Sequence, residues 1–67
     1  MTAQLIAERL LTRAEVADLL QMPIKTLARW ASRGEGPPYL KVGRHTRYDI
    51  GELRRWLDDQ RSQRRTS

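Results

Sequence analysis

The stretch LTRAEVADLLQMPIKTLARWASRG, residues 11–34, decides the fold, because it predicts two short helices separated by a tight turn. Thr12 and Glu15 have the spacing of a capping box, in which the hydroxyl accepts a hydrogen bond from a free backbone N–H and the carboxylate reaches back to the helix start. The apolar residues that follow are expected on one helical face: Val16, Ala17, Leu19 and Leu20. Pro23 disfavours a helical residue before it, so the first helix is expected to close at residues 21–22.

The second helix is expected to begin with Pro23 in its first turn, where the missing N–H has no consequence. Its apolar residues repeat at helical spacing and are expected to face the core: Leu27, Trp30 and Ala31. Gly34 supplies the C-terminal stop. Two short helices separated by a turn of three or four residues have the spacing of a helix-turn-helix.

A β-hairpin is expected over residues 39–48, after a loop at residues 35–38. Gly43 and Arg44 form a tight-turn pair between two arms of alternating character. One face of the hairpin is expected to be apolar, with Leu40, Val42, Thr46 and Tyr48. The other face is expected to be basic, with Lys41, His45 and Arg47. Tyr39 and Tyr48 are expected to pack at the base of the hairpin.

A third amphipathic helix is expected to follow the hairpin. Asp49 and Glu52 have the spacing of a second capping box. The apolar residues behind it share one helical face: Ile50, Leu53, Trp56 and Leu57. We expect this helix to fade after Asp59, and Trp30 and Trp56 to belong to the core.

The order helix, helix, hairpin, helix predicts a mainly α fold with a small β-hairpin, which is a winged helix-turn-helix. Residues 10–60 are expected to form this DNA-binding domain. A flexible lead-in is expected at residues 1–9, and a basic polar tail at residues 61–67.

Composition narrows the class of protein further. A chain of 67 residues is one domain, and without cysteine it has neither a disulfide framework nor a thiolate metal site. Its apolar runs are too short to span a membrane and no leader opens it, so a cytoplasmic protein is expected. An enzyme is not expected, since so few residues rarely form both a core and a walled pocket.

The net charge of +5 is concentrated in one part of the chain. Residues 25–48 contain six Lys and Arg residues against one acidic residue, whereas residues 1–24 have a net charge of −1 and residues 49–67 of +1. The excess is therefore a patch on the second helix and the hairpin, which predicts a polyanionic partner.

Double-stranded DNA fits this patch, because a helix of this kind enters the major groove while a basic hairpin reaches the neighbouring backbone or minor groove. Arg29 can pair with guanine O6 and N7 through two parallel hydrogen bonds, so we expect it to read a base. Three residues suit phosphates: Lys25, Thr26 and Arg33. Ala28 is expected to contact a thymine methyl.

The expected DNA contacts of the wing are Lys41, Arg44, His45 and Arg47. An alternative interpretation stays open for these wing charges, namely protection of an edge strand from aggregation. For the cations of the second helix, the alternative is an ordinary solvated face. His45 is the only histidine and there is no cysteine, so the sequence offers no metal ligand set and no cofactor is expected.

Three motifs carry a family resemblance: LTRAEVA at residues 11–17, TLARW at residues 26–30 and KVGR at residues 41–44. Together with Arg47-Tyr48 and the helix of Leu53, Trp56 and Leu57, they resemble the excisionase family. These small DNA-binding proteins have a winged helix-turn-helix related to that of MerR regulators. Pro23-Ile24 departs from the family pattern, which usually has a Ser or Thr cap and a polar residue there. Ala28 stands where a larger residue is common.

The resemblance implies a recombination directionality factor of a phage, prophage or integrative element. Such a protein binds repeated sites beside copies of itself, bends the DNA and directs an integrase toward excision without catalysing the reaction. No small-molecule effector is implied. The same scaffold is similar to small MerR-like transcription regulators, which is the alternative function. A third hypothesis, from another class, is a protein–protein adaptor whose basic face docks an acidic partner.

Overall fold

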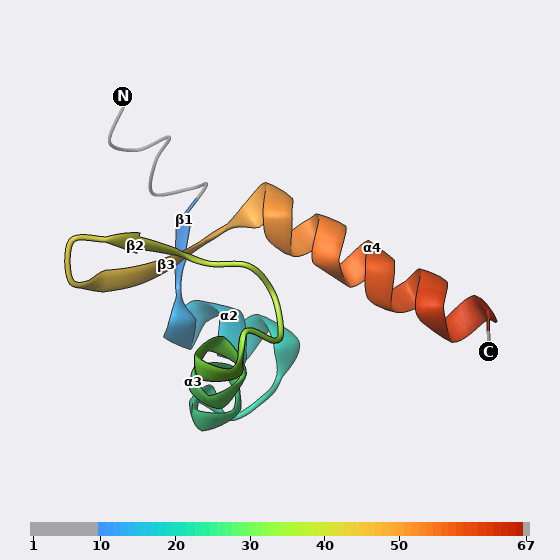
Figure 1. Ribbon diagram of the computed structural model, residues 1–67, viewed down its shortest axis with the longest axis horizontal. Helices are drawn as coiled ribbons and strands as arrows, with labels where there is room; N and C mark the ends of the chain where they lie inside the picture. Colours follow the sequence, from blue (N-terminus) through green and yellow to red (C-terminus); the bar gives the residue numbers. More distant parts are fainter. Residues whose placement is uncertain (1–9, 67) are drawn as a thin grey trace.

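The computed structural model describes residues 10–66, with side chains to residue 62. Its elements in chain order are β1 (Leu10–Thr12), α2 (Arg13–Leu20), α3 (Ile24–Arg33), β2 (Leu40–Val42), β3 (His45–Asp49) and α4 (Ile50–Thr66) (Figure 1). The expected fold class is confirmed: three helices surround a small antiparallel sheet, as in a winged helix-turn-helix. The lead-in expected at residues 1–9 lies outside the described residues.

β1 is an element that the sequence pattern did not predict. It pairs antiparallel with the far end of β3, so the hairpin becomes a three-stranded sheet of order β1-β3-β2. Leu11 lies opposite Tyr48, and Thr12 lies opposite Arg47. Three residues are too few to show alternation, and their partners are more than 30 residues away along the chain, so no local signal marks this strand.

The predicted capping box forms at the start of α2. The Thr12 N–H donates to Glu15 Oε1 at 2.8 Å, and the Glu15 N–H donates to Thr12 Oγ1 at 3.1 Å. The helix ends as expected: Gln21 has a left-handed conformation with φ of 54°, and the Met22 N–H donates to the Ala17 carbonyl. These two ends limit α2 to eight residues.

The expectation that Leu19 belongs to the apolar face of α2 is wrong, because its side chain is 60% exposed. Val16 and Ala17 are buried, and Leu20 packs against the core. Consecutive residues of a helix are about 100° apart around its axis, so a helix of this length that turns Val16 and Leu20 inward leaves Leu19 at the edge.

α3 follows after the three-residue turn of residues 21–23. Pro23 occupies the N-cap, one position before the first helical residue, and offers no side-chain hydrogen bond there. Leu27 is 1% exposed and anchors the helix in the core. Gly34 ends the helix in a left-handed conformation with φ of 71°, as expected for a C-terminal glycine.

The hairpin turn is correctly predicted at residues 43–44, with Gly43 at φ of 64°. The prediction of one apolar face and one basic face is wrong. Directly paired residues project from the same face of a sheet. Leu40 pairs with Arg47, Lys41 with Thr46, and Val42 with His45. Each face therefore mixes apolar and basic side chains.

α4 begins where β3 ends. The Asp49 carboxylate accepts a hydrogen bond from the Glu52 N–H at 3.0 Å, which satisfies a free donor of the first turn. The helix continues to Thr66, so the expectation that it fades after Asp59 is wrong, and most of the expected tail is helical. Residues 60–66 contain no Gly or Pro and are rich in Arg and Gln, which favour helix, and Arg near the C-terminus suits the helix dipole.

The core joins all three helices to the sheet. Its buried side chains are Val16, Ala17, Leu27, Tyr48 and Leu53. Trp30 and Trp56 are half-buried and pack against it, with ring centroids 6.0 Å apart. Tyr48 is 1% exposed, and the centroid of its ring lies 6.1 Å from that of the Tyr39 ring. The Tyr48 hydroxyl accepts a hydrogen bond from Arg13 Nε at 3.3 Å. The tyrosine packing expected at the hairpin base is confirmed. No helix in residues 10–66 is long and apolar enough to cross a membrane.

Candidate nucleic-acid interface

Three cations form a stripe along the outer surface of α3. Lys25, Arg29 and Arg33 follow one another at intervals of four residues, so they project from one side of the helix. All three are exposed, and none of their side chains forms an ion pair within the described part of the chain. Their guanidinium and ammonium groups are therefore free to bind an external anion.

Thr26 and Ala28 lie at the borders of this stripe, and both are half-buried. The Thr26 N–H donates to the Pro23 carbonyl at 3.0 Å, so it is already used within the first turn of α3. Ile24, at the start of the helix, is an apolar side chain that is 47% exposed. The first turn of α3 thus presents an apolar group beside the three cations.

The wing residues are placed differently from one another. Arg44 is exposed in the turn at the tip of the hairpin, and His45 is exposed beside it. Lys41 is exposed on the face that it shares with Thr46, whereas Arg47 projects from the opposite face. Arg47 is also half-buried and its Nη1 donates to the Thr46 carbonyl at 2.8 Å, so it is the least available of the four.

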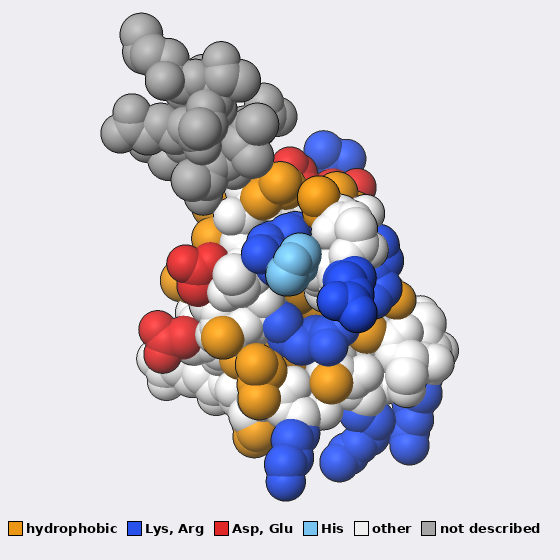
Figure 2. Space-filling model, turned by 90° about the vertical axis from the view of Figure 1, so that its left-hand side faces the viewer, with side chains coloured by type: hydrophobic (Ala, Val, Ile, Leu, Met, Phe, Trp, Pro, Cys, Tyr) orange, Lys and Arg blue, Asp and Glu red, His pale blue; other side chains and the backbone are white. Residues whose placement is uncertain are grey.

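The hairpin and α3 share one side of the molecule. Figure 2 shows Lys, Arg and His side chains gathered over these elements, with acidic side chains toward the edges of the view. Neither α3 nor β2 contains an acidic residue, and in β3 the only one is Asp49 at its end. We use the name basic face for the cationic residues of α3 and the hairpin together, although Lys41 and Arg47 project from opposite faces of the sheet. They are Lys25, Arg29, Arg33, Lys41, Arg44, His45 and Arg47. A surface of one charge sign that combines a helix with a hairpin suits a DNA duplex.

Arg13 is a residue that the sequence analysis did not single out. It is the first residue of α2, and its hydrogen bond to the Tyr48 hydroxyl connects that helix to the strand that carries the wing. The two residues are 35 positions apart, so no spacing in the sequence reveals the contact.

The fold and the basic face together define a winged helix-turn-helix protein. The chain belongs to the family described as the helix-turn-helix domain, whose family model matches residues 10–61. DNA is accordingly its partner. Comparisons with curated proteins and with solved structures gave no match. Within the described residues, no group of three or more His, Cys, Asp or Glu side chains is placed to hold a metal ion.

Proposed function

We propose that the protein is an excisionase-like architectural protein that binds repeated DNA sites cooperatively, bends the DNA and directs an integrase toward excision. The observation that carries the DNA contact is the unpaired stripe of Lys25, Arg29 and Arg33 on α3. A single recognition helix reads few base pairs, so useful specificity requires several copies on adjacent sites. The motifs LTRAEVA, TLARW and KVGR support the excisionase role.

In this proposal α3 lies in the major groove. Arg29, at the centre of the stripe, pairs with a guanine, while Lys25 and Arg33 at its two ends contact phosphates. Thr26 contacts a phosphate near the start of the helix, and Ala28 contacts a thymine methyl. The wing contacts the backbone through Arg44 at its tip and through Lys41, His45 and Arg47.

A DNase I footprint on the DNA flanking the gene tests this function directly. Protection of several repeats in an attachment region supports the excisionase role, whereas protection of a promoter supports a transcription regulator. Deleting the gene separates the two again, since the first role predicts loss of excision and the second predicts changed transcription with normal excision. Undetectable duplex binding at low salt would instead favour the adaptor hypothesis.

Arg29→Ala is expected to weaken binding to the cognate duplex by about 1–3 kcal/mol, and to relax sequence preference at one or two positions. That range corresponds to a dissociation constant raised about 5- to 150-fold. The control is Arg29→Lys, which keeps the charge but loses the two-pronged geometry, so it should retain non-specific affinity and still lose discrimination. Undiminished discrimination in Arg29→Ala, measured by competition between duplexes, would contradict the assignment.

Arg44→Ala and Lys41→Ala are each expected to weaken binding to all sequences alike. Each phosphate contact that is lost should reduce the slope of log K against log salt by about 0.9. Arg55→Ala is the matched control, because Arg55 is an exposed cation of α4 outside the basic face and should leave the slope unchanged. Equal slopes for the three variants would exclude the wing as a phosphate contact.

A further inference from the structure

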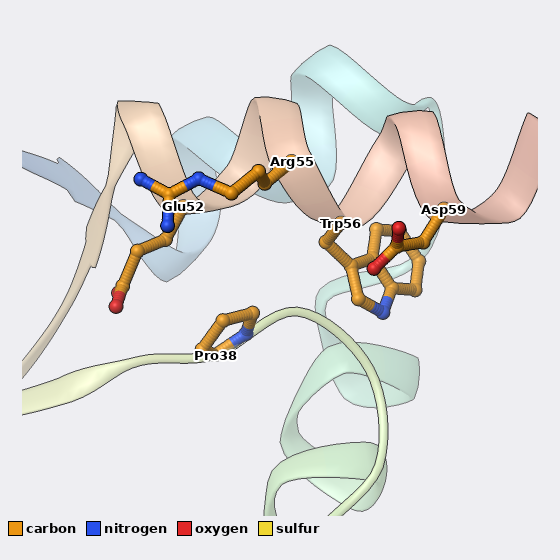
Figure 3. Close-up of a pocket in the computed structure, with 5 residues that line it drawn as sticks. All are labelled: Pro38, Glu52, Arg55, Trp56 and Asp59. Atoms are coloured by element: carbon orange, nitrogen blue, oxygen red, sulfur yellow. The ribbon is translucent and has the colours of Figure 1, made fainter.

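A shallow groove runs between α4 and the loop of residues 34–39. It consists of two hollows of about 230 and 290 Å³, and a third hollow of about 330 Å³ adjoins them along the loop, without a lining residue from α4. Trp56 lines the first and the second hollow, and Glu35 and Gly36 line the second and the third. In Figure 3 the indole of Trp56 and the ring of Pro38 border the first hollow from opposite sides. We call this surface the Trp56 groove.

The floor of the Trp56 groove is aromatic. Trp56 is half-buried and packs against Trp30 and the core, and these contacts hold its indole in place. Indole is the side chain that most strongly attracts a cation over its face. An ordered, partly exposed indole therefore provides a ready platform for an ammonium or guanidinium group.

The rim of the Trp56 groove carries three carboxylates, those of Glu35, Glu52 and Asp59. None of these carboxylates has a hydrogen bond or an ion pair in the described part of the chain. Arg55 lines the same hollow without forming an ion pair to either Glu52 or Asp59. The rim thus carries three carboxylates against the one cation of Arg55, so it is net acidic although the chain as a whole is basic.

Outside the groove, three of the four carboxylates in the described residues have local partners, and that of Asp18 has none. Glu15 and Asp49 accept hydrogen bonds from backbone N–H groups at helix starts, and Asp58 lies 3.9 Å from Arg61. The groove also lies away from the hairpin turn, because α4 leaves β3 and the 34–39 loop enters β2 at the opposite end of these strands (Figure 1). The Trp56 groove and the basic face therefore differ in position as well as in charge.

We propose that the Trp56 groove is a docking surface for an Arg- or Lys-bearing segment of a partner protein, with a cationic side chain over the Trp56 indole and between the carboxylates of Glu52 and Asp59. Charge complementarity selects this occupant, since an acidic rim repels phosphate and attracts a cation. The proposal goes beyond DNA binding, because a duplex on the basic face leaves the groove open to a second partner.

The probe is acetyl-Gly-Arg-Gly-Arg-Gly-amide, with the peptide that has citrulline at both arginine positions as an uncharged control of equal shape. Binding to the full-length chain is followed by the NMR signals of the two indole N–H groups, which belong to Trp30 and Trp56. We expect saturable binding of the arginine peptide, a larger shift for Trp56 than for Trp30, and no saturation with the citrulline peptide. The same affinity is expected with a DNA duplex present.

Glu52→Gln and Asp59→Asn keep side-chain shape and remove one rim charge each, so each is expected to weaken the peptide about two- to fivefold. Asp18→Asn is the matched control, since Asp18 is an exposed carboxylate of α2 outside the groove. Equal weakening by Asp18→Asn would show non-specific attraction and overturn the proposal. Dimers of the free protein that dissociate in Asp59→Asn would also overturn it, because the occupant would then be a second copy.

Failure of this proposal is distinguishable from failure of the proposed function. Arg29→Ala should weaken duplex binding and leave peptide binding unchanged, while Asp59→Asn should weaken peptide binding and leave duplex binding unchanged. A protein that binds the duplex but not the peptide refutes the docking surface alone.

Discussion

Tyr48→Ala is expected to lower the free energy of unfolding by about 3–5 kcal/mol, the usual cost of truncating a buried aromatic side chain. Tyr48 is 1% exposed in a core of five buried side chains, and its ring packs 6.1 Å from that of Tyr39. A domain of this size has a total stability of about 3–10 kcal/mol. The variant should therefore be largely unfolded or close to it, as followed by circular dichroism during urea denaturation.

Tyr48→Phe is the matched control for this variant. It keeps the ring in the core and removes only the hydroxyl that accepts the hydrogen bond from Arg13. The expected loss is about 0.5–1.5 kcal/mol. A Tyr48→Ala variant as stable as Tyr48→Phe would show that the ring contributes little to the core.

Gly36→Ala should have the second largest effect on stability. Gly36 has a φ of 79°, a left-handed conformation that costs an L-residue about 1–2 kcal/mol. A Cβ at this position would also lie 2.6 Å from Trp30 Cε3 and 3.1 Å from Trp30 Cβ. Trp30 would have to shift against Trp56, which adds about 1–3 kcal/mol for an overpacked site. Thermal denaturation measures the sum of the two effects.

Gly34→Ala separates these two costs. Gly34 has a similar φ of 71°, but no atom lies within 4 Å of the added Cβ. Only the conformational cost applies there, so Gly34→Ala should be clearly more stable than Gly36→Ala. Equal melting temperatures for the two variants would mean that Trp30 moves aside without loss.

The helical part of the fold could be predicted because its signals are local. The capping box of Thr12 and Glu15, the break before Pro23 and the stop at Gly34 each act within a few residues, and each occurs where expected. β1 could not be predicted, since its stability comes from partners near residue 48. The C-terminal end of α4 was placed too early because a polar sequence without apolar spacing can still be a good helix former.

The candidate site was likewise predictable only where its residues lie close together along the chain. Spacing along one helix placed Lys25, Arg29 and Arg33 together, and the structure shows them on one stripe. The prediction of the hairpin faces was wrong, although the length of the turn determines the register. Residues that flank a two-residue turn pair directly, so Val42 and His45 share a face. The hydrogen bond of Arg13 to Tyr48 and the Trp56 groove depend on tertiary contacts and have no sequence signal.

Thr12 is both the last residue of β1 and the N-cap of α2, and it pairs with Arg47 in the strand that leads from the wing. No residue separates β1 from α2, so the sheet that carries the wing is joined directly to the helix-turn-helix, and this junction limits how far the wing tip can move relative to α3. If α3 and the wing tip both contact DNA as proposed, a duplex that does not match the distance between them would have to deform. The energy of that deformation depends on base-pair stacking, so sites would be ranked partly by the flexibility of base pairs that no side chain contacts.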